Sequence, residues 1–228
     1  KTYTLLKIDE ISNLGAARIR LRSLKASMIA RSHNKKIRPQ HTYTLQRRIF
    51  TQEMKTAHTI LAPQMAPYQF RLIEKVLQRH GFNAKVLEKV TPEDIETGLK
   101  FVNNDACYPT IIVVGQLINA LLSGDYDPDN TSLFITQTGG GCRATNYVAF
   151  LRKALVDAGF PQVPVVALSA GNIESNPGVK YTPLMLHHVI QALIIGDLLQ
   201  TVLLRVRPYE AEAGAATDLY NKWDKITR

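Results

Sequence analysis

Two cysteines, Cys107 and Cys142, stand in surroundings that suit chemistry better than packing. Cys107 lies in the polar stretch 103–109, and Cys142 ends the glycine run of a second polar stretch, 136–146. Each precedes a segment with a helical pattern, and the unpaired N–H groups and positive dipole end of a helix start favour a thiolate over a thiol. The sequence therefore predicts two thiols that are more acidic than a free cysteine.

The second stretch also has the composition of a ligand-binding loop. Gly139, Gly140 and Gly141 would let the backbone approach a ligand closely, and Arg143 would add positive charge beside it. With Ala144, the first and third glycines satisfy the G-x-G-x-x-A dinucleotide pattern, but the acidic residue expected at the end of the next strand is missing. We therefore expect a cofactor-binding loop, and a bound phosphate stays an open alternative.

The competing interpretation is that both cysteines are inert core residues, since free cysteine is among the most buried residue types. Their Asn, Asp, Gly and Arg neighbours are not those of a core. Thirty-five positions separate Cys107 from Cys142, so a Cys-x-x-Cys zinc site is excluded. Only a fold that brings the two loops together could make them share a ligand.

Alternating strands and helices must position these loops. We expect strands at 58–62, 84–87, 132–136 and 163–168, and helices at 67–80, 91–102, 110–122, 143–158, 182–206 and 208–225. This alternation predicts an α/β fold, with a Rossmann-like parallel sheet and helices on both faces. Ligands in such folds bind at the carboxyl ends of the strands. Both cysteine stretches lead into helices, and each lies at the carboxyl end of a strand or directly next to one.

The first fifty residues form a separate basic segment, and residues 51–228 form the α/β domain. Residues 1–48 hold 12 basic and two acidic residues, whereas the rest of the chain holds 16 and 17, so the net charge of +9 belongs to this segment. Apolar residues at steps of three and four predict one amphipathic basic helix: Leu14, Ala17, Leu21, Leu24 and Met28. The stretch 31–40 reads as a mobile connection. Nucleic-acid binding is disfavoured, because the segment lacks a known motif and has few interleaved aromatic residues.

Composition excludes several other classes of protein. With 228 residues, 45% of them hydrophobic and 21% charged, the chain is neither disordered nor fibrous. Polar residues interrupt the most apolar stretch, 184–204, so no membrane span is expected. Two cysteines and no secretory leader predict a cytoplasmic protein. Because the chain begins at Lys1 without Met, we expect a fragment of a longer polypeptide.

Several strings of the sequence resemble one family, the large activator proteins of 2-hydroxyacyl-CoA dehydratases such as 2-hydroxyglutaryl-CoA dehydratase, multi-domain bacterial proteins that are CoA-substrate-specific enzyme activases. The matching strings are SNLGA (12–16), RIRLRSL (18–24), MK (54–55), TIL (59–61), GLKFVNNDACYP (98–109), QTGGGCRATNY (137–147) and RPYE (207–210). They span nearly the whole chain. The two strings that carry the cysteines are the longest and most specific.

The resemblance implies that the chain is similar to the dehydratase subunits, whose cysteines hold a [4Fe-4S] cluster. By this analogy Cys107 and Cys142 are ligands of an iron–sulfur cluster in the full-length protein, and we expect the isolated fragment to lack the cluster. The implied partners are other domains of the polypeptide, dehydratase subunits and an acyl-CoA substrate. The sequence lacks the nucleotide-binding signature of the activase portion, so ATP hydrolysis is not implied. A cubane cluster takes about four protein ligands, or three with one iron open, and this chain offers two cysteines.

Two functions therefore compete. The first is an iron–sulfur-associated, dehydratase-like module that takes part in electron transfer towards an acyl-CoA substrate. The second is a non-catalytic scaffold or docking domain of a larger activator. The first predicts that both sulfurs lie on one edge of the sheet. It also predicts faster alkylation at Cys142, where glycines leave the thiol open, than at Cys107, which Tyr108 and Pro109 crowd.

Overall fold

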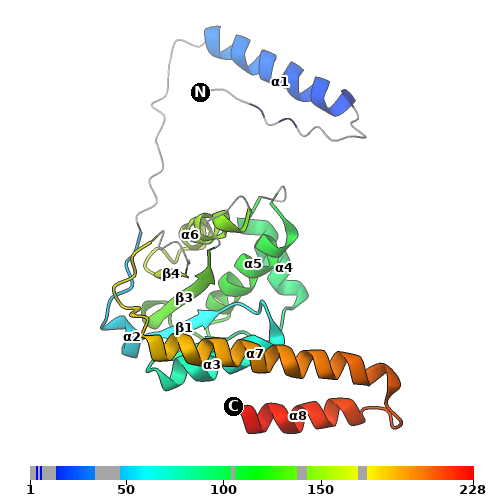
Figure 1. The fold of residues 1–228 in the computed structure, drawn as a ribbon. Helices are drawn as coiled ribbons and strands as arrows, with labels where there is room; N and C mark the ends of the chain where they lie inside the picture. The colour runs from blue at the N-terminus through cyan, green and yellow to red at the C-terminus, as the bar shows by residue number, and fades with distance from the viewer. Residues whose placement is uncertain are drawn as a thin grey trace. The chain divides into compact units, whose positions relative to one another are not determined.

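A computed structural model of the chain describes Thr4, Leu6 and residues 14–33, 47–103, 106–137, 143–168 and 174–228. The chain divides into two compact units, Lys1–Thr44 and Leu45–Arg228. Helix α1 (Leu14–His33) belongs to the first unit, and every described strand belongs to the second (Figure 1).

Helix α1 confirms the predicted basic helical segment and extends it. Arg31 and His33 form its last turn, so the connection predicted from residue 31 is helical to His33; residues 34–40 lie outside the described part. The prediction of a single apolar face is wrong. Ile19 and Ile29 lie off the predicted stripe and are 68% and 49% exposed, so apolar side chains emerge on several sides of α1.

The second unit follows the predicted alternation of strands and helices. Its elements, with η marking 3-10 turns, are α2 (Met54–Ala57), β1 (Thr59–Ala62), α3 (Pro67–Arg79), β2 (Ala84–Val86), α4 (Pro92–Phe101), α5 (Tyr108–Leu122), η1 (Pro128–Asn130), β3 (Thr131–Thr136), η2 (Arg143–Asn146), α6 (Tyr147–Asp157), β4 (Val165–Leu168), α7 (Pro183–Val206), η3 (Arg207–Tyr209) and α8 (Ala215–Thr227). The last helix starts later than predicted, because the Glu210 carboxylate accepts the N–H groups of Gly214 and Ala216 and so caps α8.

The four strands form one parallel sheet in the order β2-β1-β3-β4. The register pairs Ile60 with Ala84, Leu61 with Leu133, and Ile135 with Ala167. The chain moves from β1 to one side of the sheet to form β2, and later builds β3 and β4 on the other side. The strand order therefore reverses between β1 and β3, the point at which parallel α/β sheets bind ligands.

Helices cover both faces of this sheet, as predicted. Successive strand residues point to opposite faces. On one face the buried core includes Leu61, Leu133, Ile135, Val165 and Ala167 from the strands, packed with residues of α5 and α6. On the other face it includes Ile60, Ala84 and Val166 with Phe50 and Met185. Figure 1 shows α5 and α6 on one side of the strands and α3 and α7 on the other. The fold is therefore the predicted α/β class.

Helices α4 and α5 pack at a distance that only glycine permits. A Cβ on Gly98 would lie 2.1 Å from the carbonyl oxygen of Ile111, and a Cβ on Gly115 would lie 1.9 Å from that of Asp94. At its start, α4 has the predicted capping box, in which the Asp94 carboxylate accepts the N–H of Thr91 at 2.8 Å. This close contact determines how α5 lies against α4.

An ion-pair cluster ties residues 47–50 to the sheet domain. Arg152 of α6 donates two hydrogen bonds to the Glu174 carboxylate, at 2.7 and 2.6 Å. Arg47 lies 3.7 Å from the same carboxylate and donates to Asn176 at 2.9 Å. The bonds from Arg152, together with the charges of both arginines, hold the pKa of Glu174 below its usual range.

Helix α7 leaves much of its apolar surface uncovered. It packs on α3, where Gly196 lies against Gln69, yet Leu186, Ile194 and Leu198 are 58–62% exposed. The helical stretch Pro183–Tyr209 is long and apolar enough to cross a membrane, and 17% of its most apolar window is buried. By length and composition this helix differs from the expectation of no membrane span, and within the described chain it packs on α3 and α8.

Candidate functional site

The starts of α5 and α6 lie at the edge of the sheet where the strands end. Each of these helices leads into the next parallel strand, so it runs back across the face from the carboxyl edge to the opposite edge. The Cys107 sulfur lies beside the hydroxyl of Tyr147, the first residue of α6, so the two helix starts are next to each other. Cys107 directly precedes α5 and is therefore at the ligand-binding edge of the fold.

Cys107 caps the start of α5 and is half-buried. The helix begins at Tyr108, two residues before the predicted start, so the cysteine is the cap residue itself. Its carbonyl oxygen accepts the N–H of Thr110 at 2.9 Å. Its sulfur lies 3.0 Å from the Thr110 hydroxyl and 3.0 Å from the hydroxyl of Tyr147, the first residue of α6. The thiol therefore joins the starts of two helices.

The surroundings of Cys107 favour its thiolate. Hydrogen bonds with the hydroxyl of Thr110 and then with that of Tyr147 lower the pKa of the thiol below its usual range. Backbone N–H groups at the helix start lower it further, and partial burial opposes the change. The predicted acidity of this thiol is therefore confirmed in direction. Its main cause is the pair of hydroxyls, with the helix start contributing less than the sequence argument assumed.

The sequence does not single out either hydroxyl. Thr110 is 1% exposed and Tyr147 is 7% exposed, so both are fixed by packing around the sulfur. A sequence signal exists for Thr110, because three residues after a cap is the usual position of a capping partner. For Tyr147 there is no such signal, since 40 residues separate it from Cys107.

The other predicted site residues are placed less fully. Cys142, Gly139, Gly140 and Gly141 lie outside the described residues. Arg143 begins η2, and the structure describes its backbone only. The expectation that Cys142 opens an α-helix needs correction, because a 3-10 turn fills residues 143–146 and α6 begins at 147. A single 3-10 turn aligns fewer peptide dipoles than a long α-helix, so the dipole argument is weaker for Cys142 than for Cys107.

Three glutamines lie near the carboxyl ends of β1 and β3, and two of them, Gln64 and Gln116, are in contact. Gln116, which is 3% exposed, accepts the N–H of Gln64 at 2.9 Å and donates to the carbonyl groups of Leu87 and Lys89. Gln137 follows β3 directly, and its side-chain nitrogen donates to the carbonyl of Thr145 at 3.2 Å. The Gln64 amide and the oxygen of Gln137 are shielded from solvent and have no hydrogen-bond partner in the described part of the chain. The sequence does not single out these glutamines.

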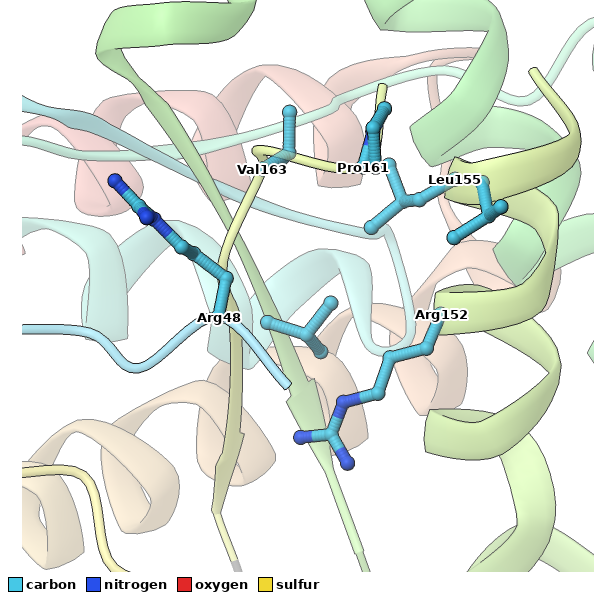
Figure 2. A pocket seen from close by; sticks show the side chains of 7 residues that line it. Arg48, Arg152, Leu155, Pro161 and Val163 are labelled. Carbon is cyan, nitrogen blue, oxygen red and sulfur yellow. The ribbon is translucent and has the colours of Figure 1, made fainter. Parts of the chain in front are cut away.

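Two hollows in the described surface lie away from this edge. One holds about 20 Å³, enough for a single water molecule, and Figure 2 shows Arg48, Arg152, Leu155, Pro161 and Val163 around it. Its lining comes from the end of α6 and the start of β4, so it lies at the opposite edge of the sheet from Cys107.

The other hollow is a groove of about 200 Å³ between α3 and α7. Lys75, Arg79 and His188 line it, together with apolar side chains of both helices. His188 lies 3.0 Å from His80, nitrogen to nitrogen. This groove belongs to the helices on the other face of the sheet, so it cannot include the cysteine.

Among the described residues, no three His, Cys, Asp or Glu side chains come together as a metal site. No family model matches the chain, and no curated protein or solved structure matches it either. The candidate site therefore consists of the Cys107 thiol with its two hydroxyls, and of the glutamines at the ends of β1 and β3.

Proposed function

We propose that this chain is a dehydratase-subunit-like module of a 2-hydroxyacyl-CoA dehydratase activator, and that it takes part in electron transfer towards an acyl-CoA substrate. In this proposal Cys107 and Cys142 bind a [4Fe-4S] cluster, with Gly139, Gly140 and Gly141 beside it. The observation that carries the proposal is the acidic, half-buried Cys107 thiol, held by two hydroxyls at the carboxyl edge of the sheet. A reducing cytoplasm is the compartment that such free thiols require.

The donor chemistry of Cys107 fits an iron–sulfur cluster. Thiolate sulfur is the ligand that these clusters take, and the lowered pKa of Cys107 favours the thiolate over the thiol. Hydroxyl groups that donate to a ligating sulfur withdraw charge from it, as Thr110 and Tyr147 are placed to do. A bound cluster would supply transfer of one electron at a time.

The number of ligands fits less well. The described residues supply one thiolate, and the sequence supplies a second at Cys142. A cubane cluster needs about two more ligands, or one with an open iron. We propose that another domain of the same polypeptide, or a dehydratase subunit, supplies them. If no other domain or subunit is present, two copies of this chain would have to share one cluster, because each copy offers two cysteines.

Anaerobic reconstitution with iron and sulfide tests the proposal. We expect the chain to turn brown, to bind about two iron atoms per copy, and to form a dimer as the cluster is built. Cys107→Ser and Cys142→Ser should each abolish the colour, whereas Tyr147→Phe should retain it with a changed reduction potential. Iron uptake that survives both serine substitutions would refute cluster binding through these cysteines, as would a colourless protein after reconstitution together with the domains that supply the remaining ligands.

The second candidate function is a docking domain without its own chemistry, and the surface of α7 favours it. Leu186, Ile194 and Leu198 form part of an exposed apolar surface on a helix of 24 residues. Exposed apolar patches of this kind mark contacts with other proteins. In this alternative the partner is another domain of the same polypeptide, and the reconstituted chain stays colourless. Ile194→Glu should then weaken assembly with the remaining domains without lowering the stability of the chain.

A further inference from the structure

The groove between α3 and α7 combines apolar side chains with basic ones. Its volume is about 200 Å³, against about 20 Å³ for the other hollow. Leu72, Val76 and Ile195 contribute apolar surface. The charged residues that line the groove, in the described part of the chain, are all basic: Lys75, Arg79 and Arg228. The groove therefore has the chemistry to bind a negatively charged group that carries an apolar portion.

The positive charge of the groove is only partly balanced. Lys75 lies 3.5 Å from Glu74, and Arg228 forms an ion pair with Asp224. Arg79 makes no ion pair within the described residues. Because Lys75 and Arg79 are four residues apart on α3, two like charges are neighbours on one face of the helix, an arrangement that destabilises a helix. An anion bound in the groove would relieve this repulsion.

His188 adds a hydrogen-bonding group to the groove. Its Nδ1 lies 3.0 Å from the Nε2 of His80. In the arrangement in which His80 donates to this nitrogen, His188 carries its own proton on Nε2 and can donate it to an anion. Burial, followed by the charges of His80 and Arg79, lowers the pKa of His188. The ring therefore lies in positively charged surroundings, which favour an anion over a metal cation.

We propose that the groove between α3 and α7 binds a carboxylate group on a short apolar chain. The planar guanidinium of arginine pairs with a carboxylate through two parallel hydrogen bonds, so the unpaired Arg79 suits the charged end of such a ligand. The apolar chain would cover Leu72, Val76 and Ile195. Since α3 and α7 lie on the opposite face of the sheet from α5 (Figure 1), this binding requires neither the Cys107 thiol nor a cluster, and it goes beyond the proposed function.

Three matched small molecules test the groove on the metal-free chain. Hexanoate has the charge and the apolar chain, hexanamide lacks the charge, and acetate lacks the chain. We expect hexanoate to shift the backbone amide NMR signal of Ala192, which lines the groove, in a saturable way with a Kd of about 1 mM. Hexanamide and acetate should each bind at least about 5-fold more weakly. Added salt should weaken the binding of hexanoate and leave that of hexanamide unchanged.

Two arginine variants separate a specific site from a general effect of charge. Arg79→Gln should weaken hexanoate binding by about 5- to 10-fold without changing hexanamide binding. Arg205→Gln is the control, because Arg205 is also exposed and also lies in the last turn of its helix, yet it is outside the groove. This control should bind hexanoate as the wild type does.

Several results would overturn the proposal. One is the absence of a saturable shift up to about 10 mM hexanoate. Another is equal affinity for hexanoate and hexanamide, or for hexanoate and acetate, because the charge or the apolar chain would then contribute nothing. An Arg79→Gln variant that has the Tm of the wild type and binds hexanoate as well as the wild type or the control does would show that the arginine does not hold the carboxylate.

Discussion

Gly115→Ala should destabilise the protein although alanine is the better helix former. The new Cβ would lie 1.9 Å from the carbonyl oxygen of Asp94, in the first turn of α4, and 2.7 Å from the backbone nitrogen of Gly98. Ordinary van der Waals contact begins at 3.4 Å, so α4 and α5 would have to separate by about 1.5 Å. Both close neighbours are backbone atoms, and no side chain can rotate away to make room.

The expected loss follows from two opposing effects. Replacing glycine by alanine inside a helix gains about 1 kcal/mol from propensity. Overpacking a tight contact costs typically 1–3 kcal/mol, and displacement of a whole helix lies at the upper end of that range. We therefore expect the free energy of unfolding to fall by about 2 kcal/mol, measured by urea denaturation. Since α5 carries Cys107 at its start, the rate of thiol alkylation at pH 7 should change in the same variant.

Gly196→Ala in α7 is the matched control. Its new Cβ would lie 2.9 Å from the Cγ and 3.0 Å from the Cα of Gln69, so the overlap is about 1 Å smaller than at Gly115. The loss of stability should therefore be smaller than for Gly115→Ala, even though both glycines are helical and buried. If Gly115→Ala were as stable as the wild type, or more stable, the helices would not be in the close contact described, and the account of how α5 is positioned would be wrong.

Three further predictions concern other contacts. Thr110→Val and Tyr147→Phe should each raise the pKa of the Cys107 thiol and slow its alkylation by iodoacetamide at pH 7, with the larger effect for Thr110→Val. If the pH profile of the alkylation rate is unchanged from the wild type, the hydroxyls do not have this role. Gln116→Leu leaves three backbone groups without partners, and it should lower the free energy of unfolding by about 3 kcal/mol in urea titrations. A loss below about 1 kcal/mol would mean that water replaces the amide. The pKa of Glu174 is lowered in the folded state, so its ion pairs stabilise the protein above the pKa of the unfolded chain, and this stability is lost as pH falls through the folded pKa. Glu174→Gln should therefore weaken the pH dependence of the free energy of unfolding between about pH 3 and 6. An unaltered pH dependence would count against the ion pairs.

Elements whose ends are set by local chemistry were predictable from the sequence. Thr182 and Pro183 mark the start of α7, where the Thr182 hydroxyl accepts the N–H of Met185 at 3.1 Å. The capping box of α4 is equally local, since Thr91 and Asp94 are three residues apart. Alternation of such helices with short apolar segments was enough to predict the parallel sheet and its two covered faces. Strand order is set by contacts between distant segments and follows only from the structure.

The surroundings of the thiol were predictable in part. The position of Cys107 before a helix follows from the local pattern of Tyr108 and Pro109. Of its two hydroxyl partners, Thr110 is local, whereas Tyr147 reaches the sulfur only once α5 and α6 pack side by side on the sheet. The sequence therefore indicated the direction of the pKa change and assigned it to the smaller of its causes.

For Gln116, the sequence predicts that the side chain needs hydrogen-bond partners but does not identify them. A glutamine in the apolar run of α5 must be either exposed or bonded, since a buried amide without partners is costly. The sequence can therefore flag this residue, but its partners lie 27, 29 and 52 residues away in the loops after β1 and β2. Gln64 and Gln137 lie in the polar connections after β1 and β3, where an amide is ordinary and flags nothing. Only the folded structure shows that atoms of their amides are shielded from solvent and have no hydrogen-bond partner among the described residues.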